Sequence, residues 1–534
     1  MKTELITTMV SLVILVHFTT TTISSTTTLP SWIISFLPIS LAMAAAAVTL
    51  PFAITTLHAR TSRNNNGAAA AAIPGPRGWP LVGSLPAVWG PLMHRRLAAL
   101  ADAHGARRLM SLTLGATPVV ISSHPETARE ILSGAAFVDR PPKAAARELM
   151  FSRAIGFAPG AEGAGDYWRR LRRVAGAGML SPRRLAALGP LRRRVADAMV
   201  ARVAAAGQIG EVVAMRGLLQ RASLESMAGS VLGLEGGAVS EELGEMVREG
   251  YELVGAFNLG DHYHTTMWGP LMDLWGVGPA CRGLAARVRG YFGKIIEERS
   301  LAGNCHERDD LLSYMLGLPE DEKLEDSDVI AVLWEMIFRG VDVVAILLEW
   351  TMARITLHPD IQFKAHKEID AVVGSHRITD ADIPNLHFLQ CIVKETLRMH
   401  PPGPLLSWAR LAVHDARVGK HIVPAGTTAM VNMWAISHDK TIWGDPWVFR
   451  PERFREQDVN ILGSDLRLAP FGSGRRVCSG RMMGLSTVQL WLGRLLQEYE
   501  WLPAKPIKLA ESLRLSMEMK NPLVCRAVRR GEAA

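Results

Sequence analysis

One short segment of the chain places a cysteine among glycines and arginines. Residues 471–480 read FGSGRRVCSG, with the cysteine at position 478. A cysteine binds iron as its thiolate, so its neighbours must stabilise negative charge and leave room for a flat macrocycle. Gly474 and Gly480 allow tight backbone turns, which let N–H groups point at the sulfur. The segment therefore indicates that Cys478 is the thiolate ligand of a haem iron.

Two further side chains of the segment can contact such a cofactor. The charge of Arg476 can pair with a haem propionate, and the ring of Phe471 can pack against the macrocycle. Residues 481–496 have apolar side chains at helical spacing, so Cys478 is expected near a helix N-terminus, whose dipole favours an anion. The alternative is that Cys478 is a buried structural cysteine in a glycine-rich loop. That alternative does not explain why one phenylalanine, two glycines, one arginine and the cysteine occur together at this spacing.

The segment resembles the signature of the cytochrome P-450 family, F-x-x-G-x-R-x-C-x-G, at every fixed position. A second signature of that family, E-x-x-R, matches Glu395 and Arg398, whose spacing puts both on one face of a helix. The resemblance implies that a second arginine, Arg453, joins this pair in the protein interior. The trio is expected to be structural, since it holds the loops on the haem side and takes no part in the chemistry.

The resemblance extends over nearly the whole chain after the N-terminal region and implies further cofactor contacts. Residues 168–172 are similar to the family's W-R-x-x-R helix, in which Trp168 and Arg172 would contact the haem propionates. Residues 400–410 resemble a pattern of plant microsomal members, with Arg410 as a third propionate partner; the spacing is one residue longer than in most of them. The implied cofactor is haem b, with NADPH supplying electrons through a separate reductase.

A long segment, residues 328–357, predicts a buried central helix because it is apolar nearly all round. In the family this helix carries an oxygen-activation motif, A/G-G-x-D/E-T, which aligns with residues 339–343, here RGVDV. The resemblance implies that Gly340 opens space for dioxygen and that Asp342 supplies protons to the distal pocket. The expected threonine is replaced by Val343, which has nearly the same shape but lacks the hydroxyl group.

The valine at this position leaves three alternatives open. A water molecule or a substrate hydroxyl can replace the missing group, which would leave a working monooxygenase that is less tightly coupled. The chain can instead rearrange or dehydrate a lipid hydroperoxide, a reaction that needs neither reductase nor protons. It can also be a catalytically impaired haem protein. We favour the monooxygenase over these and over a haem sensor or carrier, which would need no surface for a reductase.

Residues 338–340 and 405–415 most resemble the plastochron-type plant subfamily, whose members are linked to organ growth and to hydroxylation of fatty acids. The resemblance therefore implies insertion of one oxygen atom of O2 into a hydrophobic substrate. A fatty acid or another lipid is expected, with a growth-regulating signal as the product. The substrate pocket is expected to be lined by apolar residues from three segments, 140–165, 257–275 and 341–348.

Residues 1–58 are predicted to form a membrane anchor. Residues 5–18 are apolar, and residues 32–57 form an uncharged stretch long enough to cross a bilayer as a helix. Arg60 and Arg63 follow, so the positive-inside rule places the downstream chain in the cytosol, with one span or two. For a member of the resembled family this implies the endoplasmic reticulum membrane, with the catalytic domain facing the cytosol.

Behind this anchor, residues 59–80 are expected to form a flexible tether that ends in a proline-rich hinge. Residues 81–534 are expected to form one haem-thiolate catalytic domain. The predicted fold is that of the resembled family, mainly α with a small β portion. Residues 109–114 and 118–122 predict a β-hairpin, and residues 423–436 are the best candidate for a later strand.

The composition is that of an ordered globular protein, with 48% hydrophobic and 21% charged residues. The five cysteines form no CxxC pair, which argues against a disulfide framework or a zinc site. The net charge is +8, with arginine clusters within residues 169–173 and at residues 192–194, the second equally well explained as a solvated helix face. Nucleic acid is not an expected partner, because acidic residues are interspersed. The expected partners are an NADPH–cytochrome P-450 reductase docked on the first cluster, membrane lipid, O2 and a small hydrophobic substrate.

Overall fold

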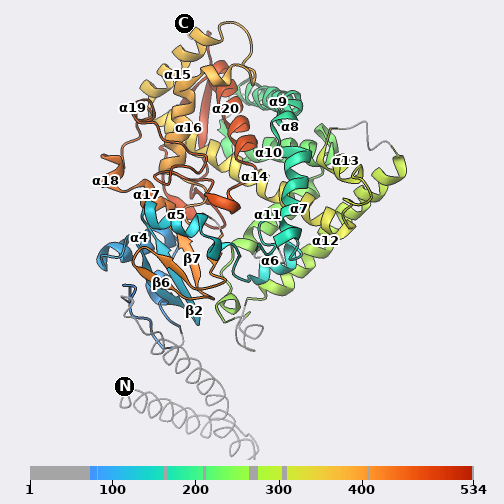
Figure 1. Cartoon of the computed structure of the whole chain (residues 1–534). Coiled ribbons are helices and arrows are strands. Elements are labelled where there is room, and N and C mark those ends of the chain that lie inside the picture. Colours follow the sequence, from blue (N-terminus) through green and yellow to red (C-terminus); the bar gives the residue numbers. More distant parts are fainter. Residues whose placement is uncertain are drawn as a thin grey trace, which may run out of the picture. The chain divides into compact units, whose positions relative to one another are not determined.

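The structure is a computed structural model of the chain, and it describes residues 72–531 except for 81, 161–164, 209–211, 264–272, 274, 304–308 and 407. The predicted membrane anchor and the first part of the predicted tether lie outside the described residues. No helix in the described part has the length and apolar character of a membrane span. The residues from Ala72 onward cluster into one compact unit in which helices predominate (Figure 1). The predicted fold class, mainly α with a small β portion, is confirmed.

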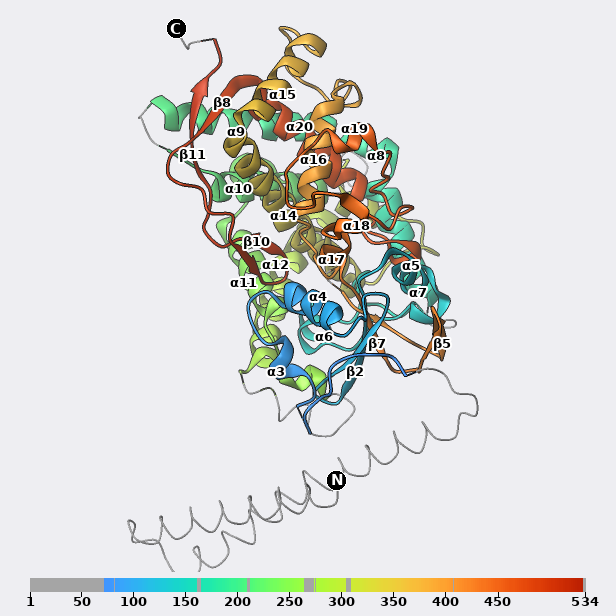
Figure 2. The same cartoon turned by 90° about the vertical axis from the view of Figure 1, so that its left-hand side faces the viewer.

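The longest helix of the described residues, α14 (Asp326–Leu357), is the predicted central helix. Its 32 residues extend over about 48 Å at a rise of about 1.5 Å per residue. Trp334 and Trp350 are fully buried on it, because neighbouring helices cover nearly every face. Figure 2 shows α14 in the middle of the helical part. The helices that pack against it include α10 (Met215–Leu232), α12 (Val277–Ala302), α16 (His387–Met399) and α20 (Arg481–Glu498).

Further helices surround these and cover the sheet. On the helical side they include α6 (Ala144–Leu149), α7 (Gly165–Ala175), α9 (Gly189–Gln208), α11 (Glu241–Gly255) and α15 (Pro359–Val372). Beside the sheet lie α4 (Met93–Ala103) and α5 (Pro125–Ser133), as Figure 1 shows at its lower left.

The main sheet has four strands in the order β1-β2-β7-β4. The strands β1 (Met110–Leu114) and β2 (Thr117–Ser122) pair antiparallel and confirm the predicted hairpin. Gly115 in their turn has a φ of 57°, which favours glycine. The strand β7 (Thr428–Val431) is parallel to β2, and β4 (Arg410–Leu411) is antiparallel to β7. The other strands form small sheets: β3 (Val213–Ala214), β5 (Ala416–Val418), β6 (His421–Val423), β8 (Tyr499–Pro503), β9 (Glu511–Leu513), β10 (Met517–Met519) and β11 (Val524–Arg529).

The predicted late strand is shorter than expected. Of residues 423–436, only the end of β6 and the four residues of β7 are in strands, and the helix α17 (Met433–Ser437) follows at once. Asn432 begins this helix, since its side chain accepts a hydrogen bond from the Ala435 N–H at 3.1 Å. The prediction was wrong for the last residues of this range because a helix cap interrupts the apolar run.

The described part of the proline-rich segment packs against the sheet. The Ser111 N–H of β1 donates to the Pro74 carbonyl at 2.8 Å. A Cβ atom at Gly75 would lie 1.9 Å from the Ser111 carbonyl oxygen, so the approach requires glycine. Backbone contacts therefore hold this end of the segment to β1.

Candidate active site

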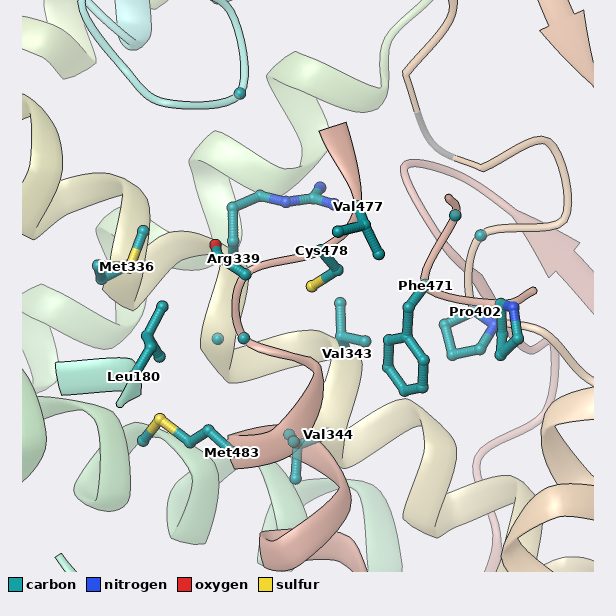
Figure 3. A pocket seen from close by; sticks show the side chains of 18 of the residues that line it. Leu180, Met336, Arg339, Val343, Val344, Pro402, Phe471, Val477, Cys478 and Met483 are labelled. Carbon is teal, nitrogen blue, oxygen red and sulfur yellow. The ribbon is translucent and has the colours of Figure 1, made fainter. Parts of the chain in front are cut away.

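Cys478 lies between a short 3₁₀ turn, η7 (Gly474–Arg476), and the helix α20, which covers the predicted helical residues. The Cys478 N–H donates to the Phe471 carbonyl at 2.9 Å and closes the loop. Gly474 has a φ of 69°, and a Cβ atom there would lie 2.3 Å from the Leu132 carbonyl oxygen. Gly474 is therefore needed for the path of the loop, which turns the Cys478 sulfur into a cavity (Figure 3).

This cavity, the active-site pocket, has a volume of about 290 Å³ and lies between the Cys478 loop, α20 and α14. Figure 3 shows the side chains of Cys478, Phe471 and Val343 pointing into the same space. Most of the lining is apolar. Its aliphatic side chains include Leu132, Ile155, Met179, Leu180, Met227, Met336, Val344, Leu347, Leu406, Met483 and Leu485.

Two of the three segments expected to line the pocket do so. Residues 140–165 contribute Ile155, and residues 341–348 contribute Val344. None of the described residues within 257–275 lines it. Phe257 instead packs edge-on against Trp89, with ring centroids 5.2 Å apart. Residues 264–272 and 274, in the same segment, lie outside the described part.

The environment of the Cys478 thiol combines a burial penalty with groups that favour a negative charge. Burial raises the pKa of Cys478, whereas the Gly480 N–H and the charges of Arg339 and Arg172 lower it. The residue has accessible surface, but that surface faces the pocket. A metal ion bound to the sulfur would favour the thiolate outright. Gly480 thus supplies the backbone donor that the sequence predicts next to the sulfur.

Arginine side chains form part of the pocket wall. The five that line it are Arg140, Arg172, Arg339, Arg410 and Arg476. Arg476 and Arg140 each donate to three backbone carbonyls, at 2.5–3.0 Å and 2.8–3.1 Å respectively. Arg172 donates to the Val477 carbonyl at 2.7 Å, and Arg410 to the Ser473 carbonyl at 3.4 Å. Three of the five, Arg172, Arg410 and Arg476, were predicted from the sequence to contact the cofactor, whereas Arg140 and Arg339 were not.

The crowding of these cations is costly without an anion. Burial, with repulsion from Arg476 and Arg172, lowers the pKa of Arg410 to about 9. Burial, with a contribution from Arg172, lowers the pKa of Arg476 to about 10. An anionic ligand would relieve this repulsion. The pocket therefore fits a haem, which has two carboxylates for the arginines, an apolar ring for the walls and an iron for the cysteine.

Trp168, expected to contact a propionate, lies behind the arginines and is not among the described residues that line the pocket. Its indole N–H donates to the Ile155 carbonyl at 3.1 Å. The Arg476 guanidinium carbon lies 4.4 Å from the Trp168 ring centroid, and that of Arg172 lies 5.5 Å away. Trp168 thus positions both arginines through cation–π contacts.

The central helix presents Val343 to the pocket and turns Asp342 away from it. Asp342 is 5% exposed and accepts a hydrogen bond from the Gln220 amide of α10 at 3.3 Å. Burial, reinforced by the nearby charge of Glu518, raises its pKa to about 6. Gly340 lines the pocket, yet a Cβ atom there would lie 2.5 Å from the sulfur of Met227. The missing side chain at 340 therefore makes room for α10.

Glu395 is paired with both predicted arginines. It accepts from Arg398 Nε and Nη2, each at 2.8 Å, and from Arg453 Nε at 3.0 Å. All three side chains are at most 2% exposed. The arginines also donate to carbonyls within residues 437–448, including Ser437 and Trp443. The trio fastens α16 to the chain between β7 and the Cys478 loop, and it does not line the pocket.

A cysteine sulfur opposite a buried helix, in an apolar pocket ringed by arginines, is the arrangement of a haem-thiolate protein. Residues 73–526 match the model of a protein family described as cytochrome P-450. The chain therefore belongs to the cytochrome P-450 family of monooxygenases, which implies a haem cofactor, electrons from a reductase, and O2 as co-substrate.

Several plant proteins are similar over most of their length. Cytochrome P-450 78A5 of Arabidopsis thaliana is 50% identical over 473 residues, which cover 86% of this chain and 89% of that protein. Cytochrome P-450 78A1 of Zea mays is 49% identical over 446 residues and 80% of each chain. Flavonoid 3'-monooxygenase of Arabidopsis thaliana is 31% identical over 490 residues, which cover 88% of this chain and 92% of that protein. The predicted family and the predicted likeness to its plastochron-type plant subfamily are confirmed.

Proposed function

We propose that this monooxygenase inserts one oxygen atom of O2 into a fatty acid or another lipid. The observation that supports this most is the pocket, in which the Cys478 sulfur faces an apolar wall from α14. An apolar substrate held against that wall would lie beside the cofactor. Haem b, when bound, supplies the activation of dioxygen, and the protein supplies its ligand, its surroundings and protons.

Each role falls to a residue of the chain. Cys478 would hold the iron, and Phe471 would pack against the ring. Arg172, Arg410 and Arg476 would pair with the two propionates. Asp342 would hold a proton at its carboxyl group, since a pKa of about 6 permits proton exchange near neutral pH.

We propose that the electrons come from NADPH through a reductase that docks on α7. Arg169 and Arg173 of this helix are exposed and form surface ion pairs with Asp166 and Glu322. Such exposed pairs are weak, so an acidic partner surface can replace them. The apolar N-terminal segments support a place in the endoplasmic reticulum membrane, with the catalytic domain in the cytosol. The product would be a lipid signal that regulates plant growth.

Val343 favours one other reaction. Because valine brings no hydroxyl group to the pocket, a lipid-hydroperoxide isomerase or dehydratase is the second candidate. This reaction takes both oxygen atoms from the hydroperoxide and needs no reductase.

The two reactions differ in the source of oxygen. The full-length chain with reductase and NADPH would be incubated with a fatty-acid panel under isotopically labelled O2. A monooxygenase gives products that contain one labelled atom and form only with NADPH. Conversion of fatty-acid hydroperoxides without NADPH, and no labelled product from the acids, would instead establish the second reaction. A haem-loaded chain that is inactive in both assays would be the impaired variant.

A further inference from the structure

Arg339 differs from the other four arginines of the pocket. No hydrogen bond or ion pair joins its guanidinium to a described residue, whereas Arg140, Arg172, Arg410 and Arg476 all donate to backbone carbonyls. Its Nη1 atom is buried and has no hydrogen-bond partner in the described part of the chain. A buried cation without an acceptor is unfavourable unless a ligand supplies one.

The guanidinium of Arg339 is held in place by an aromatic face. Its central carbon lies 5.0 Å from the ring centroid of Trp408. Trp408 is itself fixed, because Phe157 packs edge-on against it at 4.4 Å and Arg140 donates to its carbonyl at 2.8 Å. One face of the guanidinium is thus covered by an aromatic ring, and its N–H groups donate to no described residue, an arrangement that suits a carboxylate.

The neighbouring acid does not satisfy this charge. Glu335, one turn earlier on α14, also lines the pocket. Its two carboxylate oxygens already accept the backbone N–H groups of Ile155 at 2.5 Å and Gly156 at 2.7 Å. It forms no ion pair with Arg339 among the contacts of the described residues. The charge of Glu335 acts on Arg339 without a hydrogen bond between them, so the N–H groups of Arg339 can still donate to an anionic ligand.

Arg339 enters the pocket from α14, the helix that also contributes apolar lining residues such as Val344. Arg410 and Arg476 hydrogen-bond to backbone of the Cys478 loop or of the segments against it, whereas Arg339 projects from α14 between Met336 and Val343 (Figure 3). Four arginines besides Arg339 are available for the two propionates of a haem. Arg339 is therefore left for a further anion next to the apolar wall.

We propose that Arg339 binds the carboxylate of the substrate, so that the enzyme takes amphipathic acids and discriminates against neutral lipids of the same chain length. This inference rests on the proposed lipid oxygenation and names the group that the pocket recognises. Trp408 is a positioning residue, since it acts through the guanidinium.

The test measures binding to the full-length, haem-loaded protein by calorimetry, without turnover. The probes are dodecanoic acid, its methyl ester and dodecan-1-ol. The wild-type protein should bind the acid at least about tenfold more tightly than the ester or the alcohol, because a charge-assisted contact is lost. Arg339→Gln should weaken binding of the acid by about 10- to 100-fold and change binding of the alcohol by no more than about twofold. Arg287→Gln, which removes an exposed arginine paired with Glu249, is the matched control and should change neither.

Other outcomes would overturn the proposal. Equal binding of acid and ester by the wild-type protein would do so without any variant, and this comparison stands even if Arg339→Gln does not fold. Loss of haem in Arg339→Gln, with acid and alcohol weakened equally, would assign Arg339 to a propionate instead. Tight, Arg339-dependent binding of an acid that is never oxygenated would contradict the proposed function and leave this inference intact.

Discussion

Replacing Glu395 by glutamine removes the carboxylate that pairs with two buried guanidinium groups. Glu395 receives two hydrogen bonds from Arg398, one from Arg453 and one from the Arg450 N–H at 3.0 Å. Because the side chains of the two arginines are 0% and 2% exposed, they cannot form compensating hydrogen bonds with water. Removing one partner of a buried ion pair lowers the free energy of unfolding by about 3–5 kcal/mol. We expect Glu395→Gln to lower the free energy of unfolding by that amount.

The matched control is Glu456→Gln. Glu456 pairs with Arg450 at 2.9 Å, but these side chains are 50% and 46% exposed, so the same change should cost at most about 1 kcal/mol. Both variants would be compared with the wild-type chain by urea unfolding followed through tryptophan fluorescence, with haem absorbance recorded in parallel. Since the trio does not line the pocket, haem loss should follow unfolding and not precede it. If Glu395→Gln is no less stable than Glu456→Gln, the structural role assigned to the trio is incorrect.

Two further changes probe the central helix. Val343→Thr restores the expected hydroxyl group, and product formed per NADPH consumed should rise; an unchanged ratio would show that the hydroxyl was not limiting. Asp342→Asn removes a buried carboxylate whose pKa is raised from its ordinary 3.8 to about 6. A raised carboxyl pKa makes the wild-type fold less stable as pH rises from about 4 through 6, by up to about 3 kcal/mol. The Asp342→Asn variant should therefore have a larger free energy of unfolding than the wild type at pH 7.5, and a smaller increase at pH 5. It should also turn over more slowly. An equal increase in the free energy of unfolding at both pH values would contradict the assigned pKa.

Local sequence patterns predicted the elements that hold the site. The hairpin, the buried helix α14 and the helix after Cys478 all depend on spacing within one segment, which the sequence displays directly. The prediction of the late strand was wrong at its C-terminal end, where one residue, Asn432, caps a helix and ends the extended segment.

Such local patterns could not predict the contacts between segments that are distant in the sequence. The stacking of Arg339 on Trp408 joins residues 69 positions apart, and nothing in either segment signals the other. The family motif drew attention to Gly340, Asp342 and the valine, while Arg339 entered only through the resemblance to the plastochron-type subfamily and was assigned no role. The position of Trp168 against Arg172 and Arg476 is likewise set by the Ile155 carbonyl, which the motif does not include.

The central claim is that Cys478 holds the haem through its thiolate, and the absorption spectrum of the reduced, CO-bound full-length protein tests it most directly. The wild-type chain should show the red-shifted Soret band of thiolate ligation. Cys391→Ser, which changes another free cysteine that is buried on α16, should keep that band. Cys478→Ser should lose it even where haem remains bound. A thiolate band that persists in Cys478→Ser, or is absent from the haem-loaded wild-type protein, would contradict the account.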